Sequence, residues 1–226
     1  MSRDNAPRER QIRDLERKTG RRVSHDRFLI VCEGSRTEPM YLREIRVALR
    51  LHTASIEVRP CETGTSPRQV VEYARTLFEN GDPHKRIQKR AFEKIFAVFD
   101  RDQHDSYFDA LRMAESLDGK LRNDSKSPVS FTATASVPNF ELWLLLHFQD
   151  VLAPIERNEV IRRLRSDGRL PHYSKGQTGL YTQTQPMLGE AMLRASALCD
   201  RFTAFDAPQP YTGFGELVRL LTGLRS

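Results

Sequence analysis

The chain reads Phe28-Leu-Ile-Val-Cys-Glu33-Gly34 near its N-terminal end, five apolar residues followed at once by an acid and a glycine. A continuous apolar run of this length, bounded by a turn signal, is typical of a strand that is buried on both faces of a sheet. The pattern returns at Ile95-Phe-Ala-Val-Phe-Asp100-Arg-Asp102. We therefore predict two buried strands, each ending in acidic residues.

Helical patterns alternate with the strands along the chain. Helices are predicted after Thr37 and Ser66, at residues 107–121 and at residues 139–147, and further strands at residues 54–60 and 129–135. Strands that alternate with helices of ten or more residues favour βαβ units and a mostly parallel sheet. We predict an α/β fold in which a mostly parallel, Rossmann-like sheet is flanked by helices.

Three regions are expected along the chain. Residues 1–26 are a basic leader, flexible or helical, and residues 27–150 form the α/β core. Residues 151–226 contain helical segments joined by a polar loop, and we expect no strand among them. This last region is predicted to be a helical C-terminal extension packed on the core.

Composition excludes several classes of protein. Of 226 residues, 38% are hydrophobic and 29% charged, and no stretch approaches the roughly 18 apolar residues of a membrane-spanning helix. The first residues lack the apolar segment of a secretory signal. The three cysteines (Cys32, Cys61 and Cys199) are too few for a disulfide framework. We expect a cytoplasmic protein.

The net charge of +6 is unevenly distributed. Residues 1–22 hold eight Lys or Arg and four Asp or Glu, a net charge of +4, which leaves +2 for the rest of the chain. Such a leader attracts phosphate backbones in a salt-dependent way. It can equally be a solvated end, so the charge alone leaves both interpretations open.

The predicted topology gathers several acids at one edge of the sheet. Ligands of open parallel sheets bind at the carboxyl ends of the strands, where Glu33, Asp100 and Asp102 are expected. Glu38, near the start of the next helix, could reach the same cleft, whereas Arg101 should point away from it. Carboxylate oxygens suit a hard cation such as Mg²⁺. Each motif alone is more often a solvated turn, so the residues by themselves predict only a divalent-metal site.

Other candidates come from the second half of the chain. Glu141 lies in an apolar helix, where a buried acid needs a partner, a metal or the helix dipole. Lys175 lies in a polar loop and could contact a phosphate, although loop lysines are usually solvated. A cluster of arginines, including Arg157, Arg162 and Arg163, could bind a nucleic-acid backbone or form a solvated helix face.

Several segments together resemble the RloB-like family of Toprim-fold proteins. Besides residues 28–34 and 95–102, the resemblance rests on Thr37-Glu38, Asn139-Phe-Glu141-Leu-Trp143-Leu-Leu-Leu-His147-Phe148, Tyr173-Ser-Lys175, Pro210-Tyr211-Thr and Glu216-Leu-Val. It extends over residues 27–226, so only the leader falls outside it. The Phe-Glu-Leu-Trp-Leu block is distinctive, whereas Toprim proteins in general share the Glu-Gly and Asp-x-Asp pieces.

The resemblance implies a Toprim-like core and a nuclease, dependent on Mg²⁺ (or Mn²⁺), that cleaves DNA or RNA, tRNA included. It also implies a bacterial anti-phage defence role and a separately encoded ABC/AAA-type ATPase as partner, since this sequence has no Walker A motif. The alternative is a non-catalytic Toprim-fold adaptor that binds nucleic acid or the ATPase. No membrane partner is expected, and oligomerisation is left open.

Roles for single residues follow from this resemblance and from the chemistry of phosphodiester cleavage. Asp100 and Asp102 would hold the metal, and Glu33 would be a ligand or a general acid or base. Glu38 matches the second glutamate of a Gly-x-x-Thr-Glu pattern and favours two metals. The expected catalytic residues are Glu33, Asp100, Asp102 and Lys175; the metal ligands Glu33, Glu38, Asp100, Asp102 and Glu141; and the nucleic-acid-binding residues Arg36, Arg162, Arg163 and Lys175.

Overall fold

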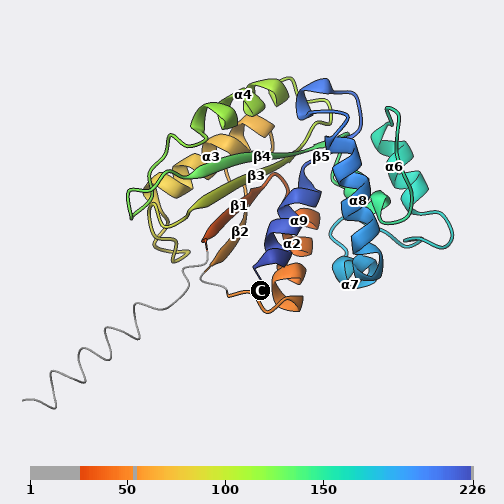
Figure 1. Ribbon diagram of the computed structural model, residues 1–226, viewed down its shortest axis with the longest axis horizontal. Coiled ribbons are helices and arrows are strands. Elements are labelled where there is room, and N and C mark those ends of the chain that lie inside the picture. The colour runs from red at the N-terminus through yellow and green to blue at the C-terminus, as the bar shows by residue number, and fades with distance from the viewer. Residues whose placement is uncertain (1–25, 53–54, 225–226) are drawn as a thin grey trace, which may run out of the picture.

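A five-stranded sheet forms the centre of the computed structural model, which describes residues 26–52 and 55–224 (Figure 1). Its strands are β1 (Phe28–Cys32), β2 (Ile56–Pro60), β3 (Lys94–Asp100), β4 (Ser130–Val137) and β5 (Tyr211–Thr212). The spatial order is β2-β1-β3-β4-β5. The first four strands are parallel to their neighbours, and β5 runs antiparallel to β4. The predicted mixed α/β class with a mostly parallel sheet is confirmed.

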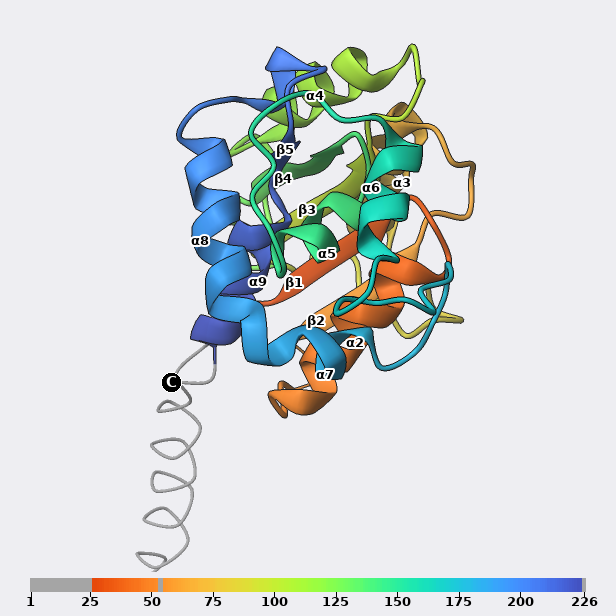
Figure 2. The same ribbon diagram turned by 90° about the vertical axis from the view of Figure 1, so that its right-hand side faces the viewer.

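Helices cover both faces of this sheet (Figures 1 and 2). One face is covered by α3 (Pro67–Asn80) and α4 (Tyr107–Leu117). The apolar cluster of the other face includes residues from α2 (Thr37–Ala48), α5 (Glu141–Leu146), α6 (Arg157–Leu164), α7 (Leu180–Thr184), α8 (Leu188–Cys199) and α9 (Phe214–Gly223). Two short 3-10 helices span Gln185–Met187 and Ala204–Asp206.

The apolar run of β1 follows from this double cover. Phe28, Ile30 and Cys32 pack in the cluster of one face, and Leu29 and Val31 pack in the cluster of the other. Because successive side chains of a strand point to opposite faces, a strand covered on both sides has to be apolar at every position.

Local signals explain where some elements begin. Ser66 caps α3 with a reciprocal pair of contacts to Gln69, the capping box that satisfies free N–H groups at a helix start. Helix α4 ends at Leu117 and α5 covers only residues 141–146, so both are shorter than predicted. Helix ends are the least certain part of any prediction from sequence.

The C-terminal region differs from its prediction in one respect. It contributes β5, which pairs with Ser136 and Val137 at the edge of the sheet, so the expectation of no strand after residue 150 is wrong. A two-residue strand is too short to show a period of two in the sequence. The predicted leader, residues 1–26, lies outside the described residues except for Asp26. Within the described ranges, no helix combines the length and apolarity needed to cross a membrane.

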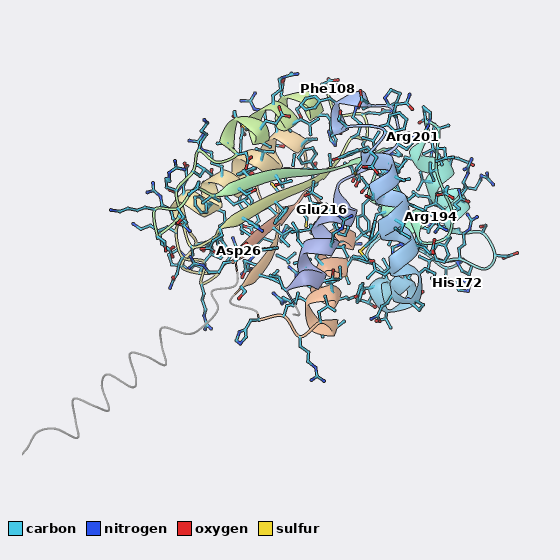
Figure 3. All side chains as sticks on the ribbon, in the orientation of Figure 1. Asp26, Phe108, His172, Arg194, Arg201 and Glu216 are labelled. Carbon is cyan, nitrogen blue, oxygen red and sulfur yellow. The ribbon has the colours of Figure 1, made fainter. Side chains whose placement is uncertain are left out.

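Two arginines hold neighbouring elements together. Arg194 joins α8 to α5, and Arg101, which precedes α4, contacts that helix. Arg194 of α8, labelled in Figure 3, donates from Nη1 to the carbonyl oxygen of Leu146 at 2.8 Å. Arg101 lies over the rings of Tyr107 and Phe108, 5.4 and 5.7 Å from their centroids. Arg101 is thus directed onto α4, as expected of a structural residue.

Candidate active site

One cleft at the carboxyl edge of the sheet contains all the acids that the sequence nominated. It has a volume of about 480 Å³. Its wall includes five carboxyl side chains and three basic ones: Glu33, Glu38, Asp100, Asp102, Glu141, Arg36, Arg157 and Lys175. The acids come from three segments of the chain, at residues 33–38, 100–102 and 141, and the fold brings these segments together.

Glu33 and Asp100 are neighbours because β1 and β3 are adjacent and parallel, with Cys32 opposite Val98. The backbone N–H of Glu33 donates to the carbonyl of Val98 at 2.8 Å, which extends the pairing one residue beyond β1. In return, the N–H of Asp100 donates to Glu33 Oε2 at 2.9 Å. The second oxygen, Oε1, lies 3.5 Å from His104 Nε2. The Glu33 carboxylate is therefore fixed beside Asp100.

Asp102 reaches the same cleft through a turn. Its φ is +32°, outside the strand region, and its N–H donates to the carbonyl of Pro138 at 3.0 Å. Its Oδ2 accepts from Arg157 Nη1 at 2.6 Å, while Oδ1 is buried and has no hydrogen-bond partner in the described part of the chain. The two aspartates share the cleft because the chain turns after Asp100, and not by simple alternation along a strand.

Glycine at position 34 leaves room for Glu38. A Cβ atom at Gly34 would lie 3.1 Å from Glu38 Oε2, tighter than almost all real contacts of this kind. Glu38 is in the first turn of α2, so its carboxylate folds back over the turn between β1 and α2. The glycine therefore accommodates a side chain of the protein itself.

Glu141 is held by a loop from the C-terminal region. It is the first residue of α5 and only 2% exposed. The hydroxyl of Tyr173 donates to Glu141 Oε1 at 2.8 Å, which supplies the partner that a buried acid requires. The same loop is attached to α2 by the Gly176 N–H, which donates to Thr37 Oγ1 at 3.1 Å. Lys175 lies between these two attachments and lines the cleft.

The acids of the cleft shift one another's titration. Burial raises the pKa of Asp100 well above its usual range, and the charges of Glu38, Glu33 and Glu141 raise it further. Burial also raises the pKa of Glu38 to about 7, against an opposing backbone hydrogen bond and with added repulsion from Glu141 and Glu33. The pKa of Glu33 is raised, mainly by burial. Burial and mutual repulsion therefore both oppose ionisation of these acids.

The carboxylate oxygens of the cleft are ligands of the type that a hard divalent cation binds. Mg²⁺ and Mn²⁺ both prefer such oxygens. Asp102 and Glu141 each use one oxygen to accept a protein hydrogen bond and have a second oxygen left, whereas the second oxygen of Glu33 faces His104. However, no three Asp, Glu, His or Cys side chains of residues 26–52 and 55–224 are positioned to hold one ion as they stand. Binding would require carboxylates to rotate.

The cleft does not include two of the predicted nucleic-acid-binding residues. Arg162 and Arg163 lie further along α6, and each donates to Glu159 at 2.6 Å. Arg36 and Lys175 do line the cleft. A nucleic-acid-binding role stays a prediction for all four.

Sequence reasoning did not foresee two contacts. Arg157 was one arginine among several, and nothing in its spacing singled out an ion pair with Asp102, which lies 55 positions earlier. Tyr173 belonged to a segment of family resemblance, but its bond to Glu141 is a tertiary contact. Neither could be found from periodicity, because both depend on how the C-terminal region packs on the core.

Comparison with known proteins gives one match. A family model described as RloB-like protein matches residues 28–221, from β1 into α9. The match therefore includes every residue that lines the cleft. No curated protein and no solved structure gives a match.

Proposed function

The chain belongs to the RloB-like family, and from this premise we propose that it is a nuclease, dependent on Mg²⁺ or Mn²⁺, that hydrolyses phosphodiester bonds of DNA or RNA. One observation carries the proposal: five carboxyl groups from three segments of the chain converge on one cleft that also holds Arg36 and Lys175. Acids suit metal ions, and the basic side chains suit the phosphate group whose P–O bond a nuclease breaks.

The cost of this arrangement supports a functional role. Buried like charges disfavour their own ionised state, as the raised pKa of Asp100 indicates. Groups with such shifts, placed in a cleft, occur preferentially at functional sites. A cation would offset the repulsion, whereas a purely structural role would be better served by uncharged side chains.

Each residue of the cleft receives a role in this proposal. Asp100 and Asp102 would hold the metal with Glu33, and Glu38 and Glu141 are placed to complete the set or to hold a second ion. When bound, the metal neutralises the scissile phosphate and activates a water molecule. Lys175 would bind a phosphate oxygen and stabilise the charge that develops there. Glu33 is either a ligand or the group that transfers a proton.

The family resemblance supports a biological setting. A Toprim-type site, a role as effector in bacterial anti-phage defence and activation by a separately encoded ABC/AAA-type ATPase are parts of the same proposal. The sequence has no Walker A motif, so ATP hydrolysis would be the task of that partner.

Two observations favour a second candidate, a non-catalytic adaptor that binds nucleic acid or the ATPase. Arg157 neutralises Asp102 at 2.6 Å, and the described side chains form no ready three-ligand metal site. An acid that is permanently paired with an arginine would not need a metal. This candidate predicts binding without cleavage.

A cleavage assay separates the two candidates. The full chain, with and without its partner ATPase, is incubated with plasmid DNA and with total tRNA in Mg²⁺, Mn²⁺ or EDTA. We expect cleavage that needs the metal and is lost in Asp100→Asn. The matched control is Asp109→Asn on α4, an exposed acid paired with Arg112. Binding without cleavage in every combination would favour the adaptor.

A further inference from the structure

A second hollow lies directly beside the acidic cleft. It has a volume of about 460 Å³, and its wall includes Gln103, His104 and Asn158. It shares Asp102 and Arg157 with the acidic cleft. The two hollows are therefore neighbours, and the ion pair between Asp102 and Arg157 stands at their boundary.

The chemistry of the second hollow differs from that of the cleft. Gln103 and Asn158 each present a side-chain amide, which carries donors and an acceptor in one plane. Both residues are exposed, and neither amide makes a hydrogen bond to the part of the chain that the structure describes. Asn and Gln amides match the paired donors and acceptors on the edges of nucleobases.

Arg157 has hydrogen-bonding capacity to spare at the boundary. Its Nη1 donates to Asp102 Oδ2 at 2.6 Å, and 39% of its side chain is exposed. A guanidinium has five N–H donors in a planar fork, and the bond to Asp102 uses one of them. A phosphate that joins a nucleotide in each hollow would lie next to the donors that remain.

We propose that the second hollow is a subsite for the nucleotide that flanks the scissile phosphate. Gln103 and Asn158 read the edge of its base, and Arg157 binds the phosphate on its boundary side. The occupant is an unpaired nucleotide whose Watson–Crick edge faces these amides, because base pairing would occupy that edge. The inference rests on the proposed nuclease function and adds a base preference to it.

Binding of short oligonucleotides tests the subsite without cleavage. The probes are four fluorescent single-stranded hexanucleotides, each of one base, and their affinities for the full chain are measured by fluorescence anisotropy in Ca²⁺. Arg157→Ala should weaken binding of all four about tenfold, the size expected for a charged hydrogen bond. Arg157→Lys, which keeps the charge and loses the fork, should lie between wild type and Arg157→Ala.

Replacing Gln103 or Asn158 should change base preference and not overall affinity. Gln103→Ala and Asn158→Ala should change the ratio of affinities among the four bases by about threefold or more, because each loses contacts to particular bases only. The control is Arg112→Ala on α4, an exposed arginine that pairs with Asp109 and lines neither hollow. Thermal melts of all variants confirm that they are folded.

The outcomes separate this inference from the function on which it rests. Unchanged base ratios in both amide variants, or an unchanged affinity in Arg157→Ala, would overturn the subsite even if the wild type cleaves nucleic acid. A wild type that binds with a base preference dependent on Gln103 and Asn158, yet never cleaves, would overturn the nuclease and leave the binding subsite standing.

Discussion

The carboxyl group of Asp100 is held where a negative charge is unfavourable. It is 7% exposed, and four other acids line the same cleft. Desolvation and repulsion from these acids both oppose ionisation of Asp100. Its pKa therefore lies well above the usual range. The folded protein tolerates this group only at a cost in stability, and a bound cation would reduce that cost.

Replacing Asp100 by Asn should therefore stabilise the metal-free protein at pH 8. The amide keeps the shape of the side chain and removes the charge, so the free energy of unfolding should rise by about 1 kcal/mol. Urea denaturation in EDTA measures it. Trp143→Ala is the contrasting variant: Trp143 is fully buried, and its loss should cost about 3–5 kcal/mol. A similar loss in Asp100→Asn would show that the acid is a structural partner.

Stability should also depend on pH through the same groups. A carboxyl whose pKa is raised on folding binds its proton more tightly in the folded state, so its stabilising effect is present at low pH and disappears as the pH rises through the folded value. For Glu38 this window runs from about 4.3, the ordinary value, to about 7. We expect the melting temperature in EDTA to fall between pH 5 and pH 8, and Glu38→Gln to reduce the slope. An unchanged slope would mean that Glu38 does not titrate in this window.

At the scale of elements, the loop that follows α6 completes the site. Tyr173 donates to Glu141, Gly176 donates to Thr37, and Lys175 lies between them in the wall of the cleft. The loop therefore connects the starts of α2 and α5, two helices that follow different strands. Its position is fixed by these polar contacts and by the packing of Leu170 and Tyr173 in the apolar cluster of this face.

Tyr173→Phe should loosen this loop. The variant keeps the ring and removes the hydroxyl that donates to Glu141. The buried carboxylate then lacks this hydrogen bond, and the free energy of unfolding should fall by about 1–3 kcal/mol. Hydrogen exchange should increase at residues 173–179 and stay unchanged in α3 on the other face. When Tyr173→Phe is added to Glu141→Gln, the free energy of unfolding should fall by less than it does in the wild-type background. The reason is that a neutral amide is less costly to bury than a carboxylate. Additive effects of the two changes would contradict a direct contact.

The elements differ in how well the sequence predicts them. β1 and β3 are readily predicted, because burial on both faces imposes an apolar residue at every position and the acids follow at once. The convergence of Glu33 and Asp100 follows from parallel topology alone, whereas Asp102 joins them through the turn after β3. Arg157 and Tyr173 could not be predicted, since their contacts join segments 55 and 32 positions apart. The strand β5 escaped prediction because two residues carry no periodicity.

At the scale of the whole molecule, the C-terminal region shares its core with the sheet. The apolar cluster on one face combines residues of β1 and β3 with Val160, Leu164 and residues of α8 and α9. The ring of Phe214 lies 5.7 Å from that of Trp143, and a Cβ at Gly215 would lie 3.4 Å from the Trp143 ring. β5 also covers one edge of the sheet. These contacts are those of a single core and not of two units that touch.

A chain that ends at residue 150 should consequently fail to fold. It would expose Trp143 and its fully buried neighbours in α5, and it would leave the edge of β4 without β5. We expect no cooperative thermal transition, weak near-UV circular dichroism and strong binding of an apolar dye. Deletion of residues 1–22 is the control, because it removes none of the described residues and should leave the melting temperature unchanged. A cooperative transition in the truncated chain would show instead that the α/β core folds alone, and that residues 151–226 are an appended domain which supplies Arg157, Tyr173 and Lys175 to a site built elsewhere.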